Sequence, residues 1–228
     1  MHKKIKIIKN GPYEVTENIP LNQAIIEIDS NATSTSWKKG KEYEKQNEPY
    51  HLCRCGHSKN KPYCDGTHEK INFDGEELAS KKPYIEGCAV YEGEDLILYD
   101  NEDLCASMRF CDRGEGVWQA TIDSSNKKSK KLAIQEAADC ASGRLTVAEK
   151  DGTVIEPVLE KEISPIEDTA AQQRGPLWVK GGIELEGADG ELYETRNRMT
   201  LCRCGESQNM PYCDISHMNC PHMKGFDK

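Results

Sequence analysis

Two short segments, far apart in the chain, carry cysteines and a histidine at matching spacings. The first reads HLCRCGHSKNKPYCDGTH over residues 51–68, and the second reads TLCRCGESQNMPYCDISH over residues 200–217. In the first segment one residue separates Cys53 from Cys55. Side chains two apart on an extended chain point to the same face, with Cα atoms roughly 6.5 to 7 Å apart. Two thiolates placed in this way can clamp one iron ion.

A cysteine and a histidine close each segment. Cys64 and His68 are four residues apart, which places them on one face of a helical turn, where they can hold a second iron. Gly66 lets the backbone come close at this turn, and a helix N-terminus would stabilise an anionic cluster beside it. Each segment therefore offers three cysteines and one histidine as metal ligands: Cys53, Cys55, Cys64 and His68, and then Cys202, Cys204, Cys213 and His217.

The pattern Cys-x-Cys-x2-Ser-x3-Pro-x-Cys-Asp-Gly-Thr-His resembles the CDGSH iron–sulfur family, of the mitoNEET type. The first segment matches it throughout. The second departs at Ile215, where the family has glycine, which puts the local backbone turn in question but removes no ligand. The resemblance implies a 2Fe–2S cluster in each segment, held by three cysteines and one histidine. It also implies small β-rich units, which pair as homodimers when a chain has a single motif.

Zinc is the alternative occupant of these segments, because three cysteines and one histidine are also a zinc ligand set. Two to four residues usually separate the cysteines of a zinc knuckle, and here only one does. A long motif found twice therefore favours iron–sulfur clusters over a zinc-stabilised interaction module. Replacing a thiolate by imidazole raises the reduction potential, and histidine can take up a proton near neutral pH. Cluster retention and potential are thus expected to depend on pH.

Four further cysteines lie between the two segments, and three of them form a recognisable pattern. Five residues separate Cys105 from Cys111, and Cys140 follows in the run Glu-Ala-Ala-Asp-Cys-Ala-Ser-Gly-Arg-Leu. This arrangement resembles single-cluster ferredoxins, in which Cys-x5-Cys and a distant Cys-Pro supply three ligands, although Ala141 stands here in place of proline. The resemblance implies a 3Fe–4S or 4Fe–4S cluster, with Cys88 as a fourth candidate ligand that its spacing does not require. The alternative is that these are reduced cysteines packed as small apolar side chains.

Composition limits the elements that hold these sites. Only 36% of the 228 residues are hydrophobic, so the cores should be small and bound metal should help hold the fold. The net charge of -9 argues against a nucleic-acid partner, and neither a membrane span nor a signal peptide is expected. A cytoplasmic location is expected, where eleven cysteines indicate metal rather than disulfides. Cys220 is expected to be a free thiol of the tail, and His57 and His222 to face solvent.

An internal repeat surrounds a different middle part. Gly-Pro-Tyr-Glu-Val at residues 11–15 precedes the first cysteine segment, and Gly-Pro-Leu-Trp-Val at 175–179 precedes the second. We therefore expect three units: a first CDGSH unit at 1–80, a ferredoxin-like segment at 81–160 and a second CDGSH unit at 161–228.

Local patterns suggest the elements of these units. The expected strands lie at residues 4–8, at a sheet edge, and at 96–99, 117–122 and 145–148. A helix is expected over 127–139, capped within Asp123-Ser-Ser-Asn126 and stopped by Gly143. Two polar stretches are expected to lack regular structure: a solvated loop at 31–46 and an acidic linker at 160–173.

The expected fold class is α+β. A chain with two copies can build within itself the pair that single-motif family members form between chains. We therefore predict an intrachain pseudo-dimer with an approximate two-fold axis, unequal cluster sites and exchanged strands, since identical elements swap at low cost. The ferredoxin-like insert should lie outside the shared β core. The alternative is two independent lobes joined by the acidic linker.

The function predicted from these features is electron transfer or redox sensing. No Ser-His-Asp set, Walker loop or dinucleotide fingerprint is found, so an enzyme is not expected. The expected partner is an unidentified redox protein or a cluster acceptor. An iron–sulfur cluster storage or transfer protein is the alternative, because a histidine ligand is more easily released than a thiolate.

Overall fold

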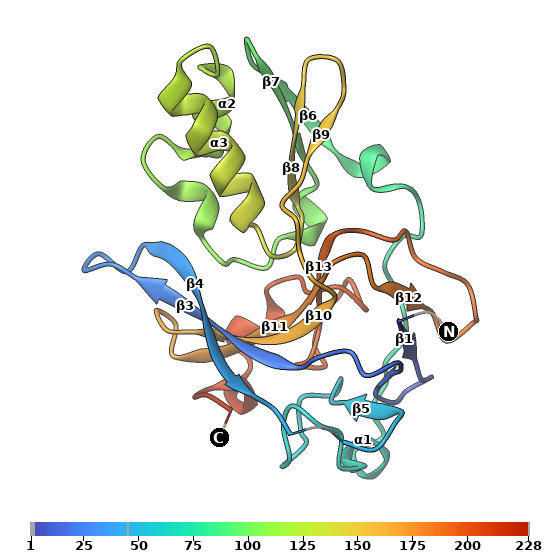
Figure 1. The fold of residues 1–228 in the computed structure, drawn as a ribbon. Helices are drawn as coiled ribbons and strands as arrows, with labels where there is room; N and C mark the ends of the chain where they lie inside the picture. Colours follow the sequence, from blue (N-terminus) through green and yellow to red (C-terminus); the bar gives the residue numbers. More distant parts are fainter. Residues whose placement is uncertain (1–2, 45, 228) are drawn as a thin grey trace.

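The structure, a computed structural model, describes residues 3–44 and 46–227 of the chain. These residues form three β-sheets and few helices, so the expected α+β fold class is confirmed (Figure 1). Two of the sheets combine strands from both copies of the repeat, and the third belongs to the middle part.

The first two sheets have four and five strands. The first sheet has the order β12-β1-β2-β5. Its strands are β1 (Lys4–Ile7), β2 (Tyr13–Val15), β5 (Tyr50–Leu52) and β12 (Glu184–Glu186). The second sheet has the order β13-β11-β10-β3-β4. Its strands are β3 (Asn22–Ile28), β4 (Ser34–Glu42), β10 (Glu162–Asp168), β11 (Gln173–Lys180) and β13 (Arg198–Leu201).

A pseudo-two-fold relation connects these two sheets. In the first sheet β1 runs parallel to β12, with Ile5 opposite Leu185. In the second sheet β10 runs parallel to β3, and Ile163 lies opposite Leu21 in a parallel bridge. The order β12-β1-β2-β5 therefore recurs as β3-β10-β11-β13. Each copy lends one strand to the other, so the chain forms the expected pseudo-dimer with exchanged strands.

One apolar core lies between the two copies. Almost fully buried side chains from both copies meet in it, among them Ile5, Val15, Leu52, Ile163 and Leu185. Burying each large aliphatic side chain contributes about 1.5 to 3 kcal/mol. The two cysteine segments thus rest on a shared core and not on separate lobes.

The middle part forms its own layered unit (Figure 1). Its sheet has the order β6-β7-β8-β9, and α2 and α3 pack against it. The elements are β6 (Ala89–Glu92), β7 (Leu96–Asp100), α2 (Gly116–Ile122), α3 (Lys127–Asp139), β8 (Leu145–Glu149) and β9 (Val154–Ile155). Leu98, Val117, Ala133 and Val147 belong to a separate apolar core. This unit lies outside the shared β core, as expected.

Short helical turns complete the fold. They are α1 (Thr67–Lys70), η1 (Tyr84–Gly87), η2 (Glu102–Leu104), η3 (Phe110–Asp112), η4 (Ser216–Asn219) and η5 (Pro221–Met223). Within the part of the chain that the structure describes, no helix has both the length and the apolar character to cross a membrane.

The predicted helix and two predicted strands of the middle part are confirmed as α3, β7 and β8. Asn126 caps α3, because its Oδ1 accepts a hydrogen bond of 2.8 Å from the backbone nitrogen of Lys128. Gly143, the expected stop, lies beyond the end of the helix. Its φ of 62° turns the chain toward β8.

Two predictions for short segments are wrong. Residues 117–122, expected to form a strand, belong to helix α2. The buried residues Val117, Ala120 and Thr121 follow the spacing of one helix face, which the apparent alternation concealed. Strand β1 exists but is not at a sheet edge, because the exchanged strand β12 pairs with its outer side.

Both polar stretches contain strands, so these two predictions are also wrong. Residues 31–46, expected as a loop, contain β4, the exposed edge of the second sheet. Residues 160–173, expected as a linker, contain β10, a central and almost fully buried strand. An acidic strand can be buried when its charges are paired, and Glu162 of β10 forms an ion pair with Lys180 of β11.

Candidate metal centres

Each cysteine segment forms a closed loop after a short strand. In the first copy the backbone nitrogen of Cys53 donates to the carbonyl of Pro62 at 2.8 Å, and that of Cys64 donates to His51 at 2.9 Å. In the second copy the nitrogen of Cys202 donates to Pro211 at the same distance of 2.8 Å. These bonds return the end of each loop to its beginning. The Cys-x-Cys pair and the later cysteine are thereby brought to the same end of the strand.

The thiols of each Cys-x-Cys pair face one another. The Sγ atoms of Cys53 and Cys55 are 3.8 Å apart, and those of Cys202 and Cys204 are 3.5 Å apart. A tetrahedral metal with metal–sulfur bonds of about 2.3 Å needs a separation of about 3.8 Å. The hydrogen bond between the thiols lowers the pKa of Cys55 to about 6 and that of Cys202 to about 7. One thiolate is therefore readily formed in each pair.

The predicted cysteine–histidine pairs also meet. Nδ1 of His68 lies 3.3 Å from Sγ of Cys64, and Nδ1 of His217 lies 3.3 Å from Sγ of Cys213. In both copies Nδ1, and not Nε2, faces the thiol, so Nδ1 is the ring atom placed to bind a metal. The structure thus brings together the two members of each Cys-x-Cys pair and of each cysteine–histidine pair that the sequence proposed.

The turn before each histidine is the same in both copies. Gly66 has a φ of 79°, in the left-handed region that favours glycine. Ile215 takes a φ of 78° at the corresponding position. The turn that the substitution put in question is therefore retained, at a strain cost of about 1 to 2 kcal/mol.

The two histidines have different surroundings. The side chain of His68 is 15% exposed, and its Nε2 lies 3.9 Å from the exposed carboxylate of Glu69. His217 is buried, and its Nε2 has no hydrogen-bond partner among the described residues. Burial lowers the pKa of His217 to about 4. The expected inequality of the two sites is confirmed in these surroundings.

Two buried arginines brace the cysteine pairs from within. Arg54 occupies the middle of the first Cys-x-Cys and donates to the carbonyls of Gly11, Gly75 and Ile8 at 2.8 to 3.0 Å. Both segments have arginine between the paired cysteines, and this shared residue is the sequence feature that could have indicated the brace. In each copy the arginine donates a hydrogen bond to the carbonyl of the glycine in the repeated Gly-Pro motif.

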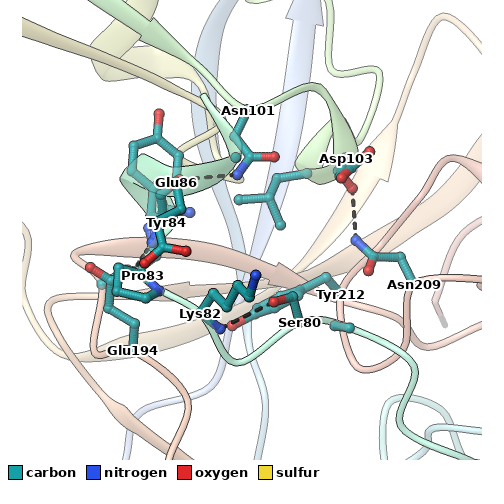
Figure 2. Close-up of a pocket in the computed structure, with 14 residues that line it drawn as sticks. Ser80, Lys82, Pro83, Tyr84, Glu86, Asn101, Asp103, Glu194, Asn209 and Tyr212 are labelled. Carbon is teal, nitrogen blue, oxygen red and sulfur yellow. Dashed lines mark hydrogen bonds between the residues drawn. The ribbon is translucent and has the colours of Figure 1, made fainter. Parts of the chain in front are cut away.

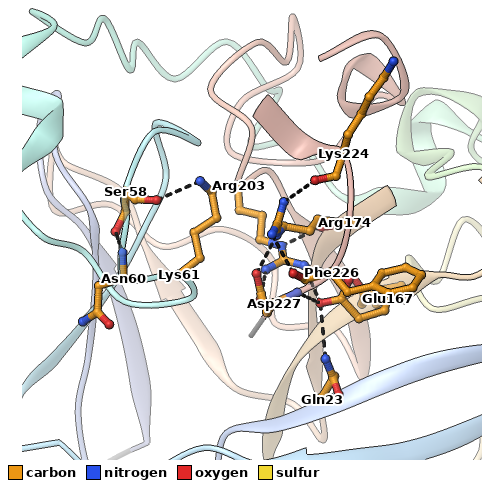
Figure 3. A network of polar contacts seen from close by, with 12 residues as sticks. Gln23, Ser58, Asn60, Lys61, Glu167, Arg174, Arg203, Lys224, Phe226 and Asp227 are labelled. Atoms are coloured by element: carbon orange, nitrogen blue, oxygen red, sulfur yellow. Dashed lines mark hydrogen bonds and ion pairs between the residues drawn. The ribbon is translucent and has the colours of Figure 1, made fainter. Parts of the chain in front are cut away.

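Arg203 plays the same part in the second copy. It donates to the carbonyls of Gly175 and Ile166 and, at 2.6 Å, to Oδ2 of Asp227. Figure 3 shows Asp227 held between Arg203 and Arg174, with Glu167 beside them. A carboxylate here replaces the backbone carbonyl that Arg54 uses, so the second loop is tied to the C-terminal segment by a buried ion pair.

The two cysteine loops lie against each other. A Cβ added to Gly56 would meet the carbonyl oxygen of Cys204 at 2.4 Å, so only glycine fits this contact. His57 and His222 stack across it with ring centroids 4.2 Å apart. Nδ1 of His57 donates to the carbonyl of Cys55, and Nε2 of His222 donates to that of Cys204. His57 is exposed, as predicted, but both rings join the two loops.

Cys220, expected to be a free thiol of the tail, is a free thiol, but the tail that carries it is folded against the second loop. It is buried in one apolar cluster with the four cysteines of the two Cys-x-Cys pairs. Its thiol donates to the carbonyl of Ser216 at 3.3 Å. The turn η5 folds back over the second loop, a long-range contact that the sequence did not reveal.

A cavity in the middle part collects its cysteines. Cys105, Cys111 and Cys140 all line this cavity of about 330 Å³, together with Arg109 and Arg144. Burial raises the pKa of Cys111 to about 12, and the neighbouring thiols act in the same direction. Three thiols around one cavity could supply ligands to a group larger than a single ion.

The middle cavity adjoins the second centre. Cys213 belongs to one buried cluster with Ala106, Met108, Phe110 and Ala141, which also line the cavity. Cys88, the other candidate ligand, lies outside this set. Its thiol donates to the carbonyl of Tyr84.

A second, polar cavity of about 190 Å³ lies where the middle part meets the second cysteine loop. Figure 2 shows Asn209 of that loop donating to the carbonyl of Asp103 at 2.8 Å. Arg196 stacks on the ring of Tyr84, 3.8 Å from its centroid. The hydrogen bond between Asn209 and Asp103 joins the middle part to the second loop at this cavity. No cysteine lines the cavity, so it offers no thiol ligand.

Comparison with protein-family models agrees with these centres. Residues 10–69 and 174–218 match the iron-binding zinc finger of CDGSH type. Residues 91–150 match a divergent 4Fe-4S mono-cluster family. The comparisons with curated proteins and with solved structures gave no match. The chain thus contains two regions of the CDGSH iron–sulfur type, and they flank a region similar to a divergent 4Fe–4S mono-cluster family.

Proposed function

We propose that this iron–sulfur protein is an electron carrier with three clusters. Two 2Fe–2S clusters would be held by the CDGSH ligand sets, and a third cluster would lie in the middle cavity. The proposed ligands are Cys53, Cys55, Cys64 and His68; Cys202, Cys204, Cys213 and His217; and Cys105, Cys111 and Cys140. When bound, each cluster supplies one-electron redox chemistry.

The arrangement of the ligands supports two-iron clusters. In each copy they form a Cys/Cys pair and a Cys/His pair, each at the spacing that one metal ion needs. In residues 3–44 and 46–227, no three side chains of His, Cys, Asp or Glu converge as a single ion requires. A mononuclear zinc site would need all four ligands around one point.

Three thiols around the middle cavity suit a 3Fe–4S cluster, or a 4Fe–4S cluster with one iron bound by another ligand. Arg109 and Arg144 line this cavity, so positive charge is available beside an anionic cluster. The guanidinium of Arg144 is held by Asp100 at 2.6 Å, which fixes it in place.

The observation that carries this proposal is that the three ligand sets adjoin one another. The Cys-x-Cys pairs of both copies share one buried cluster, and Cys213 shares another with the wall of the middle cavity. A carrier needs its redox groups close together and shielded from water, whereas a storage protein does not need neighbouring sites.

Iron and sulfide counts on anaerobically purified protein test the proposal. We expect roughly four irons and four sulfides per chain from the CDGSH sets and about three to four more irons from the middle cavity. Cys111→Ser should remove the additional irons alone, and Cys88→Ser is the matched control that should remove none. Stoichiometric zinc without sulfide would refute the central claim, and wild-type counts in Cys111→Ser would refute the third cluster.

Transfer of a cluster from the first site is a second candidate function. The side chain of His68 is 15% exposed, whereas His217 is buried. A ligand at the surface can be protonated and replaced by an acceptor's thiol. Incubation with an apo-acceptor should then empty the first site before the second, and His68→Cys should slow this loss. Equal loss from both sites would contradict this function.

We also propose the unit boundaries 1–80, 81–160 and 161–228. Since β3 and β12 are exchanged, neither CDGSH unit is expected to fold by itself.

A further inference from the structure

Two buried polar atoms near the second centre lack partners. Nε2 of His217 and Oδ2 of Asp168 are both fully buried, and neither has a hydrogen-bond partner among the described residues. The first is a ring nitrogen that carries hydrogen when Nδ1 binds a metal, and the second is a carboxylate oxygen. A buried donor and a buried acceptor are each costly to leave unpaired, by about 1 to 3 kcal/mol.

The fold places Asp168 and His217 on adjoining elements, although no hydrogen bond joins Oδ2 and Nε2 in the structure. Asp168 ends β10 and lies directly opposite Gln173 of β11. Residues paired in this way have Cα atoms about 4.5 to 5.5 Å apart. The side-chain amide of Gln173 donates to the backbone carbonyl of His217. Asp168 therefore lies on the strand next to Gln173, the residue whose side chain bonds to His217.

The electrostatics agree with this placement. Burial lowers the pKa of His217, and the carboxylate of Asp168 is the strongest opposing influence. The side chain of Asp168 is 0% exposed.

The first copy has no buried carboxylate at the corresponding position, and Glu69, whose carboxylate lies 3.9 Å from Nε2 of His68, is exposed. The carbonyls of Ile8 and Ile166 accept equivalent hydrogen bonds from Arg54 and Arg203, so these two residues correspond. Two residues further along, Asn10 of the first copy therefore corresponds to Asp168 of the second. Oδ1 of Asn10 accepts a hydrogen bond of 3.1 Å from the backbone of Gly75.

Asp168 is also tied to the middle part. Its Oδ1 accepts a hydrogen bond of 2.6 Å from Nη2 of Arg109, which lies in the loop between Cys105 and Cys111. Nη1 of the same guanidinium donates to the carbonyl of Ser107 at 2.7 Å. Arg109 lines the middle cavity, so one side chain connects the wall of that cavity to Asp168.

We propose that Asp168 is a positioning residue for the second centre, whose Oδ2 accepts a hydrogen bond from Nε2–H of His217 while Arg109 of the middle loop holds its Oδ1. The inference rests on the proposed function, in which His217 binds iron. A carboxylate on the far nitrogen makes an imidazole a stronger donor to the metal and fixes its orientation. The potential of the second centre is thereby set from the middle part, and that of the first is not.

Asp168→Asn tests the link because asparagine keeps the shape and the acceptor for Arg109. The two 2Fe–2S potentials are followed by EPR-monitored titration, with ¹⁵N-histidine hyperfine spectra and iron and sulfide counts. The potential of the second centre should rise and its histidine ¹⁵N coupling should change, while the first centre stays as it was. Asn10→Ala is the matched control and should move neither centre. Unchanged potential and coupling in a fully loaded Asp168→Asn protein would overturn the proposal.

The contribution of Arg109 is tested by a double-mutant cycle. Arg109→Gln should shift the second potential in the wild-type background and lose that effect when Asp168 is already asparagine. An equal shift in both backgrounds would overturn the role of Arg109.

If the variants fail to bind their clusters, a measurement on the unaltered protein still tests the proposal. After exchange into D₂O, the deuterium quadrupole coupling at Nε2 of His217 should be reduced, as for an N–D bonded to oxygen. The value of a free N–D would overturn the proposal. Absence of any histidine nitrogen coupling would instead refute the proposed function, so the two failures are distinguishable.

Discussion

Replacing Glu136 by glutamine should stabilise the middle part of the molecule, and the gain should depend on pH. Glu136 lies in α3, and its side chain is 0% exposed. Its Oε1 accepts a hydrogen bond of 2.7 Å from the backbone nitrogen of Arg113, just after Cys111. Its Oε2 is buried without a partner in the part of the chain described. Burial raises the pKa of Glu136 from 4.5 to about 7.

The sign of the effect follows from this shift. A carboxyl group whose pKa is higher in the folded chain stabilises the fold while it carries its proton. That contribution is fully present below pH 4.5 and is lost as the pH rises through about 7. Each pKa unit corresponds to about 1.4 kcal/mol, and glutamine imitates the protonated group. We therefore expect a gain of about 2 to 3 kcal/mol at pH about 8.5 and almost none at pH about 4.5.

Amide hydrogen exchange in α3 and β8 measures this local stability. Comparing variant and wild type at the same pH cancels the intrinsic exchange rates. At pH about 8.5 exchange in Glu136→Gln should be slower by about 30- to 150-fold, as each 1.4 kcal/mol is tenfold. Glu149→Gln is the control, because Glu149 is half exposed and pairs with Lys130. Equal protection at both pH values, or the same gain at both, would refute the reasoning.

The remaining predictions concern the CDGSH centres. His68→Cys should lower the potential of the first cluster and make it less sensitive to acid in spectroscopic titrations; unchanged values would mean that His68 is no ligand. Gly66→Ala should cost about 1 to 2 kcal/mol in urea unfolding, because φ is 79° while the space for a Cβ is open. Asp227→Asn should cost about 3 to 5 kcal/mol by leaving Arg203 buried without its partner, a cost that unchanged urea midpoints would disprove. Asp189→Asn, at an exposed pair, should change the midpoint little.

Features that depend on nearby residues could be predicted from the sequence. The cysteine–cysteine and cysteine–histidine pairs follow from spacing, because side chains two apart on an extended chain and four apart at a turn are brought together. Helix α3 was predictable because its cap, Asn126, and its helix formers are contiguous. The pseudo-dimer was predictable because the Gly-Pro preamble is repeated before each cysteine segment.

Features that depend on distant partners could not be predicted. Strand β10 looks like a linker because three of its seven residues are acidic, and ion pairs with the distant residues Lys180, Arg203 and Arg109 help make its burial tolerable. The position of β1 inside a sheet depends on β12, which is far along the chain. Nothing in the sequence singled out Asp168, because its proposed role depends on His217, which lies on another element.

Joining two copies in one chain allows each centre to differ, which a homodimer of identical subunits cannot do. Tyr13 of the first copy donates to the carbonyl of Cys202 at 2.8 Å and so braces the second loop. Leu177 stands at the corresponding position of the second copy and has no hydroxyl to return this bond. In a homodimer such a change would remove the brace from both loops, and a buried carboxylate like Asp168 would appear beside both histidines. The single chain instead keeps one centre buried against the middle part and leaves the histidine of the other near solvent. This division would suit the proposed electron carrier, in which the second cluster would be tuned from within the chain and the first would meet the partner.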